Sequence, residues 1–155
     1  MGLIERMAKA SDKFYDRMRS ADATSVADAD PTGTIDDLRG HKYCVLVSYR
    51  KNGQPMPSPL WFGVADGKVY FQTSPDGYKV KRINNNPEVR VGPCDSRGKP
   101  KGAPFAGKAR VLPESESKTA ERAIRSNYGL GRRIYTAFSG RVPNVYVEVT
   151  PAGTN

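Results

Sequence analysis

Hydroxyl groups and positive charge gather in one short stretch of the sequence, TSPDGYKVKRINNNP, at residues 73–87. Lys79, Lys81 and Arg82 fall within four positions there, between two segments that have the pattern of strands. The first N–H groups of a helix lack intrahelical partners and can bind an anion. Cationic side chains at the same helix start would strengthen such a site. We therefore consider an anion site at this stretch.

An ordinary turn would explain the same residues. In the anion site, the hydroxyls of Thr73 and Ser74 would donate to phosphate oxygens, and Lys79 would lie in the first turn of the following helix. In the alternative, Ser74 or Asp76 is an N-cap and the lysines form a solvated face. Spacing alone leaves both alternatives open.

Charge is distributed unevenly along the 155 residues. The chain has a net charge of +9, and residues 78–110 hold nine Lys or Arg against two acids, a net +7. Such a balance favours anionic partners. Nucleic acid is not expected, because aromatic residues are too sparse in this segment for base stacking.

Other kinds of chemistry have little support. His41 is the one histidine, and Cys44 and Cys94 are the only cysteines, without the spacing of a zinc site. We predict no metal site and no catalytic side chain. No apolar run approaches the length of a membrane span or a signal peptide, so we expect no membrane partner and a cytoplasmic protein.

The hydrophobic pattern predicts a mainly β chain with peripheral helices. Tight turns such as Asn52-Gly53 separate many of the strands, so the sheet should be antiparallel, and six strands with few helices are typical of a small barrel. We expect an extension at residues 1–33 and a barrel domain at 34–155. The expected strands are 43–50, 56–64, 68–73, 89–95, 102–112 and 144–149, and the expected helices are 2–20, 77–85, 115–127 and 132–138.

Three alternating prolines, Pro55, Pro57 and Pro59, begin the second expected strand. Proline cannot donate to a ladder, so this strand should start at a sheet edge or against a ligand.

The run from Val45 to Leu112 resembles a known family, the flavin/deazaflavin oxidoreductases of the pyridoxamine 5'-phosphate oxidase-like split β-barrel superfamily. Within it, the chain is most similar to the branch B actinobacterial proteins described as F420-dependent. The most specific part is the strand ending at Thr73 followed by GYKVKRINNNPEVRV, similar to the family pattern T…K…I..NP.V. The resemblance covers about residues 34–150.

This resemblance implies a six-stranded antiparallel split β-barrel of the FMN-binding kind. It also implies a homodimer with a cofactor in each cleft between subunits. Gln72 and Thr73 match strand-end positions that contact the cofactor, and Tyr78 and Lys79 match positions that hold its phosphate. The implied cofactor-binding residues are Pro57, Ser58, Pro59, Leu60, Trp61, Gln72, Thr73, Ser74, Gly77, Tyr78, Lys79, Lys81 and Arg82.

The chain departs from the oxidase where that enzyme holds FMN. The oxidase has a basic residue at each end of its second strand, in an Arg-x-Val-Leu-Leu-Lys pattern, whereas this strand is MPSPLWF, and Tyr78 replaces an arginine. These departures disfavour FMN and pyridoxamine phosphate oxidation. They favour F420, whose phosphodiester and polyglutamate tail suit the excess of positive charge. Arg97, Lys99 and Lys101 are candidate contacts for that tail.

The resemblance thus implies an F420-dependent oxidoreductase that transfers a hydride between the deazaflavin and an unsaturated or quinone-like small molecule. No side chain need be catalytic, because the cofactor carries the chemistry. The alternatives are an FMN- or haem-binding split-barrel protein and a non-catalytic F420 carrier.

Overall fold

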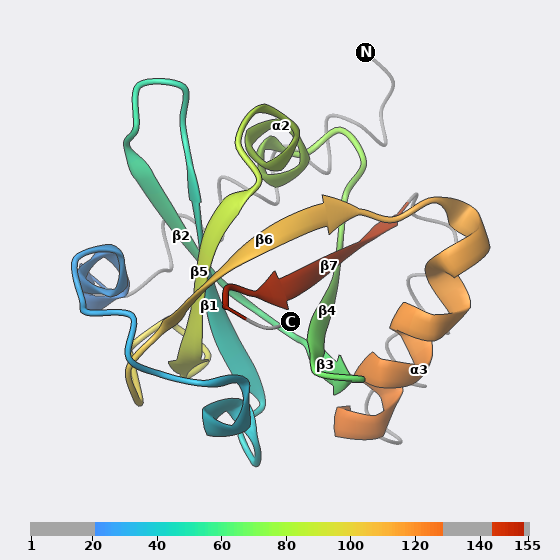
Figure 1. The fold of residues 1–155 in the computed structure, drawn as a ribbon, viewed down its shortest axis with the longest axis horizontal. Helices are drawn as coiled ribbons and strands as arrows, with labels where there is room; N and C mark the ends of the chain where they lie inside the picture. Colours follow the sequence, from blue (N-terminus) through green and yellow to red (C-terminus); the bar gives the residue numbers. More distant parts are fainter. Residues whose placement is uncertain (1–20, 129–143, 154–155) are drawn as a thin grey trace.

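One antiparallel sheet organises the molecule. The computed structural model describes residues 21–128 and 144–153, so the helices expected at 2–20 and 132–138 lie outside the described residues. The seven strands of the described part follow the order β2-β1-β5-β6-β7-β4-β3 (Figure 1). They are β1 (Tyr43–Tyr49), β2 (Pro55–Leu60), β3 (Gly63–Ala65), β4 (Lys68–Thr73), β5 (Glu88–Cys94), β6 (Phe105–Val111) and β7 (Val145–Pro151).

The segment predicted as one strand at 56–64 forms two strands, on opposite edges of this sheet. Leu60 of β2 opposes Cys44 of β1, whereas Gly63 of β3 opposes Tyr70 of β4. The prediction of six strands was wrong by one, because the chain changes its pairing partner between Leu60 and Gly63. Three peptide units span at most about 11 Å. The two edges must therefore come close at this point, and the sheet curls into the half-barrel of Figure 1.

The inward face of the curled sheet holds the main hydrophobic core. Alternate residues of a strand share a face, so Cys44 and Leu46 of β1 point inward, while Val45 and Val47 point outward. Phe62 and Phe71 are the largest fully buried side chains of the inner cluster. Its buried residues are Leu38, Cys44, Leu46, Phe62, Val69, Phe71, Ile83, Val89, Val91, Phe105, Ala109, Val147 and Val149.

Helices cover three parts of the sheet (Figure 1). Helix α2 (Tyr78–Asn85) lies near one end of the half-barrel and inserts Ile83 into the inner core. Helix α3 (Ser117–Tyr128) packs Ala123 and Ile124 on the outward face beside β3 and β4. The 3-10 helix η1 (Ala21–Ala27) covers the outward face of β1, so part of the predicted N-terminal extension packs on the barrel. Two further 3-10 helices are η2 (Ile35–Leu38) and η3 (Glu114–Glu116).

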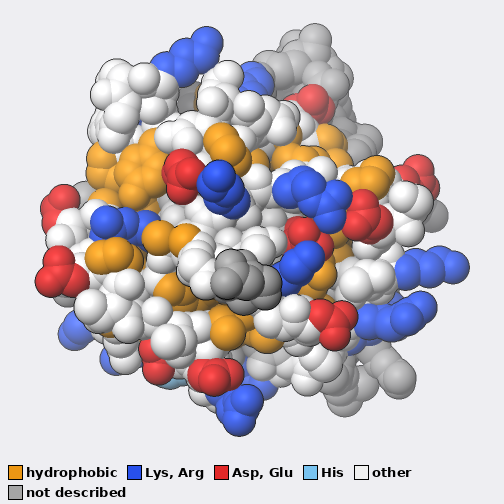
Figure 2. All heavy atoms as spheres, in the orientation of Figure 1, with side chains coloured by type: hydrophobic (Ala, Val, Ile, Leu, Met, Phe, Trp, Pro, Cys, Tyr) orange, Lys and Arg blue, Asp and Glu red, His pale blue; other side chains and the backbone are white. Residues whose placement is uncertain are grey.

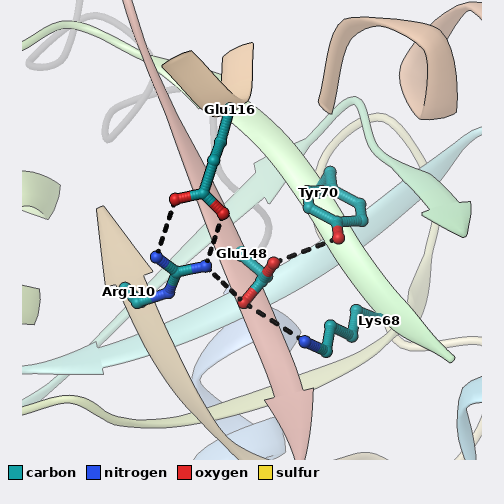
Figure 3. A network of polar contacts seen from close by, with 5 residues as sticks. All are labelled: Lys68, Tyr70, Arg110, Glu116 and Glu148. Carbon is teal, nitrogen blue, oxygen red and sulfur yellow. Dashed lines mark hydrogen bonds and ion pairs between the residues drawn. The ribbon is translucent and has the colours of Figure 1, made fainter. Parts of the chain in front are cut away.

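A polar network joins η3, at the start of α3, to the outward face of the sheet (Figure 3). Glu148, which is 7% exposed, accepts hydrogen bonds from the Tyr70 hydroxyl and the Arg110 guanidinium, both at 3.1 Å. Arg110 also donates to both carboxylate oxygens of Glu116, and Lys68 Nζ lies 3.7 Å from Glu148. Burial and the bond to Glu148 raise the pKa of Tyr70 to about 12, so its hydroxyl stays protonated at neutral pH. The network ties β4, β6 and β7 to the segment that begins α3.

We expect Gly63→Ala to destabilise the protein, because β3 and α3 touch through their backbones at this residue. A Cβ there would lie 2.1 Å from the carbonyl carbon and oxygen of Ala123. Overpacking of this kind costs about 3 kcal/mol. Gly67→Ala is the control, since its site is open and only its positive φ of 72° opposes a side chain, which costs about 1 kcal/mol. Urea unfolding compares the two, and equal losses would mean that α3 moves aside at no cost.

Acid should weaken the attachment of η3 and α3. The Arg110 hydrogen bonds hold the pKa of Glu116 below its ordinary value of 4.5. A lowered folded-state pKa adds stability that is complete above the ordinary value and is lost as pH falls through the folded one. Thermal unfolding between about pH 6 and pH 3 should therefore show a shallower decline for Glu116→Gln than for the wild type. Glu114→Gln, on the same 3-10 helix but not bonded to Arg110, should follow the wild type.

Candidate functional site

The two edges of the sheet diverge at the corner formed by Trp61 and Phe62. β3 pairs with β4 only as far as Tyr70, so the last residues of β4, including Gln72 and Thr73, extend beyond it. Continuing that register by two residues would set Trp61 opposite Gln72, but the chain instead leaves β4 and runs back through β2, which pairs with β1. We call the region bounded by β2, the corner and the end of β4 the split.

The side of the split that β2 forms lacks backbone donors at alternate positions. β2 is an edge strand of the described sheet, as its prolines predicted. In an antiparallel pair, alternate residues direct their backbone groups toward the partner strand and away from it. Since Pro55, Pro57 and Pro59 have no N–H to give, the ladder to β1 must use the residues between them. The prolines therefore face the open edge, where they hinder pairing with another strand.

Helix α2 begins just beyond the other side of the split. Its N-cap is Gly77, in an extended conformation, which has no side chain of its own to accept from the first N–H groups. The prediction of Ser74 or Asp76 as the N-cap was therefore wrong, whereas the solvated lysine face of that alternative stays a prediction. The first turn contains no acidic residue, and Lys79 lies within it. The first N–H groups of a helix, the positive end of its dipole and a lysine together favour an anion at this position.

The three cations of α2 have different surroundings. Lys81 is exposed, with its Nζ 5.9 Å from the centre of the Tyr78 ring, whereas Lys79 is half-buried. Arg82 donates from Nε to the hydroxyl of Ser48 at 2.7 Å. Ser48 is 1% exposed and shares the inward face of β1 with Leu46, so Arg82 turns toward the end of the half-barrel.

Ser48 was missed by the sequence analysis. Its only signal was a single polar residue at an inward position of an apolar strand, and its partner Arg82 lies 34 residues away. α2 follows the end of β4 in the chain, and this hydrogen bond connects it to β1. Because Ser48 opposes Met56, the contact lies on the pair formed by β1 and β2. The helix thereby connects both sides of the split.

Every predicted cofactor-binding residue borders the split or lies in α2 and the loop before it. The corner side chain, Trp61, stacks on Tyr128 of α3, with ring centres 4.6 Å apart. Ser58 and Thr73 are both 8% exposed, and Tyr78 is the most open aromatic of the set at 39%. By element, they are Pro57, Ser58, Pro59 and Leu60 in β2, Trp61 at the corner, Gln72 and Thr73 in β4, Ser74 and Gly77 in the loop, and Tyr78, Lys79, Lys81 and Arg82 in α2.

The rest of the basic segment does not join this group. The turn with Arg97, Lys99 and Lys101 follows the far end of β5 from α2, and seven strand residues span about 20 Å. Lys108 is 3.8 Å from Glu88, and Arg110 belongs to the network under η3. On the face shown in Figure 2, Lys and Arg side chains alternate with Asp and Glu and form no continuous basic patch. For the candidate anion site, the local charge at α2 therefore matters more than the net charge of +7 on residues 78–110.

Other chemical groups in the described residues are placed for structure. Cys44 and Cys94 are buried free thiols, and burial raises the pKa of both, that of Cys94 to about 12. No three His, Cys, Asp or Glu residues in the described ranges converge as metal ligands. Within those ranges, every helix is too short or too polar to cross a membrane.

Comparisons with known proteins agree with this architecture. An FAD-binding protein from Mesorhizobium loti is 21% identical, with a TM-score of 0.55 over 76% of this chain and 84% of that one. The haem storage protein HutZ from Vibrio cholerae is 15% identical, with a TM-score of 0.59 over 77% and 87%. A structure titled F420 reductase is 17% identical, with a TM-score of 0.54 over 80% and 97%. At these identities the likeness concerns the fold.

The sequence itself supports a closer assignment. No curated protein matches the chain. Residues 32–152, however, match the family described as pyridoxamine 5'-phosphate oxidase, and they include all the described strands. The order of the strands and the split between β2 and β4 agree with the split barrel expected for that family. The chain therefore belongs to the pyridoxamine 5'-phosphate oxidase family.

Proposed function

We propose that this protein is an oxidoreductase that binds a flavin-type cofactor at the split, with the cofactor phosphate at the N-terminus of α2. The observation that carries the proposal is the start of that helix. Gly77 caps it without a side chain, its first turn has no acid, and Lys79 lies in that turn. A solvated helix start in this position would gain stability from a Ser or Asp cap, so the bare start is better suited to an anion.

The residues around this start fit a phosphate. Backbone N–H groups of the first turn, the Lys79 ammonium and the Ser74 hydroxyl supply donors of the kinds that phosphate accepts. The hydrogen bond from Arg82 to Ser48 fixes the helix against β1, so the donors are held in place before the ligand arrives. Tyr78, exposed beside them, offers a ring face to an aromatic group.

Among flavin-type cofactors we propose F420. β2 has no Lys or Arg, so the second side of the split offers no cation for FMN of the kind that the oxidase uses. The names of similar folds, an F420 reductase and an FAD-binding protein, support a flavin-type ligand without choosing between them. We further propose that the protein acts as a homodimer in the cytoplasm, with a second subunit completing each site.

A bound flavin-type cofactor supplies the hydride chemistry, here to an unsaturated or quinone-like small molecule. The tasks of this chain are then to hold the phosphate, to orient the ring along β2 and to leave one ring face open to the acceptor.

Capping α2 artificially should separate helix stability from anion binding. In Gly77→Asp the new carboxylate can accept from the uncapped N–H groups, so the variant should be at least as stable as Gly77→Ala, which controls for the added Cβ. The same carboxylate repels a phosphate, and we expect F420 affinity to fall at least tenfold relative to Gly77→Ala. Fluorescence titration measures both variants. Equal affinities would place the phosphate elsewhere.

Cofactor choice is tested by titrating the purified wild-type protein with F420, FMN, FAD and haem. We expect F420 to bind most tightly, and Lys79→Ala to weaken it about tenfold, a typical loss for one charge-assisted hydrogen bond. Lys118→Ala, at the exposed start of α3, is the matched control and should bind as the wild type does. Preference for FMN or haem would replace the cofactor assignment. Tight F420 binding without oxidation of reduced F420 by any quinone or enone would indicate a carrier.

A further inference from the structure

The corner between β2 and β3 is held by two side chains from the end of α3. A chain that leaves one ladder for another exposes backbone groups that need new partners. The Phe62 N–H donates to the Tyr128 hydroxyl at 2.9 Å, and the Phe62 carbonyl accepts from Asn127 Nδ2 at 3.1 Å. Asn127 and Tyr128 therefore satisfy both backbone groups of the residue at which the sheet changes edge.

The same two side chains reach the segment before β1. The Tyr128 hydroxyl donates to the carbonyl of Lys42, and Asn127 Nδ2 lies 3.3 Å from the carbonyl of His41. Since the Tyr128 hydroxyl is both donor and acceptor, it has to remain protonated, and burial raises its pKa. Two neighbouring residues of one helix thus fasten the corner to the start of β1.

The ring of Tyr128 acts on Trp61 directly. The two rings stack with centres 4.6 Å apart and an angle of 18° between their planes. Lys42, just before β1, places its Nζ 5.5 Å from the centre of the Tyr128 ring. Trp61 and Gly63 alternate with the inward Phe62, so the indole faces outward beside α3. A hydroxyl that is bonded at two backbone positions fixes the plane of Tyr128, and the stacked indole is constrained with it.

We propose that Tyr128 is a positioning residue of the cofactor site, with Asn127 as its support: it orients Trp61 as the wall against which the cofactor ring packs. This inference rests on the proposed function, because it requires a flavin-type ring at the split. A half-buried indole that is already held in one orientation loses less freedom when a ring packs on it, which favours binding. α3 is then part of the site although none of its residues was predicted to touch the cofactor.

The chain offers a direct readout, since Trp61 is its only tryptophan. Tyr128→Phe keeps a ring for stacking and removes both hydrogen bonds of the hydroxyl. Tyr146→Phe is the matched control, because it removes a tyrosine hydroxyl that also binds α3, through Glu121 at 2.6 Å, away from the corner. Each full-length variant is examined by acrylamide quenching of Trp61 without cofactor, by urea unfolding, and by titration with F420, FMN and FAD.

We expect quenching of Trp61 to rise in Tyr128→Phe and to stay at the wild-type value in Tyr146→Phe, while both variants lose some stability. Affinity for the cofactor that the wild type binds should fall about tenfold in Tyr128→Phe alone. If both variants bind as tightly as the wild type, or weaken equally, Tyr128 has only a structural role and the inference is wrong, although the proposed function stands.

A second variant keeps the test decisive if Tyr128→Phe does not fold. Asn127→Ala leaves the stacked rings intact and removes the amide that holds the Phe62 carbonyl. This variant should also raise the quenching of Trp61 and lower the affinity for the cofactor. An unchanged affinity would overturn the inference. If the wild type binds none of F420, FMN and FAD, the proposed function fails, and the positioning role fails with it.

Discussion

The structure depends on one covalent constraint: the two edge strands of the sheet are consecutive in the chain. Only Trp61 and Phe62 separate β2 on one edge from β3 on the other. The sheet therefore has to curl, and its inward face becomes a core around Phe62 and Phe71. Because β3 is three residues long and β4 is six, the barrel closes at the corner and stays open beyond it. The split follows from this difference in length.

Two elements from distant parts of the chain stabilise the open side. α2 connects the end of β4 to β1 through the bond between Arg82 and Ser48, and α3 fastens the corner through Asn127 and Tyr128. Neither element pairs with a strand edge. α2 acts through one hydrogen bond between side chains, and α3 acts through side chains that bind the Phe62 backbone, so the positions of both edges of the split are fixed.

Local patterns in the sequence predicted most of the architecture. Alternating apolar residues located the strands, and the prolines of β2 identified an edge, because both effects act within a few residues. The break at Trp61–Phe62 was missed, since a continuous apolar run has the same pattern whether it pairs with one neighbour or with two in succession. Ser48 and Tyr128 were missed because their roles come from residues 34 and 66 positions away. The predicted cofactor residues border the split, and their roles stay predictions.

The start of α2 and the edge of β2 both limit what the split could hold. Gly77 at the N-cap of α2 gives up only about a few tenths of a kcal/mol relative to Ser or Asp, and Ser74 and Asp76, both suitable types, lie within three residues of it. Three prolines leave alternate positions of the facing edge without backbone donors, which prevents another strand from pairing there. One side of the split thus presents donors to an anion, and the other excludes a β-strand. This combination supports the proposed anionic ligand over an added peptide strand.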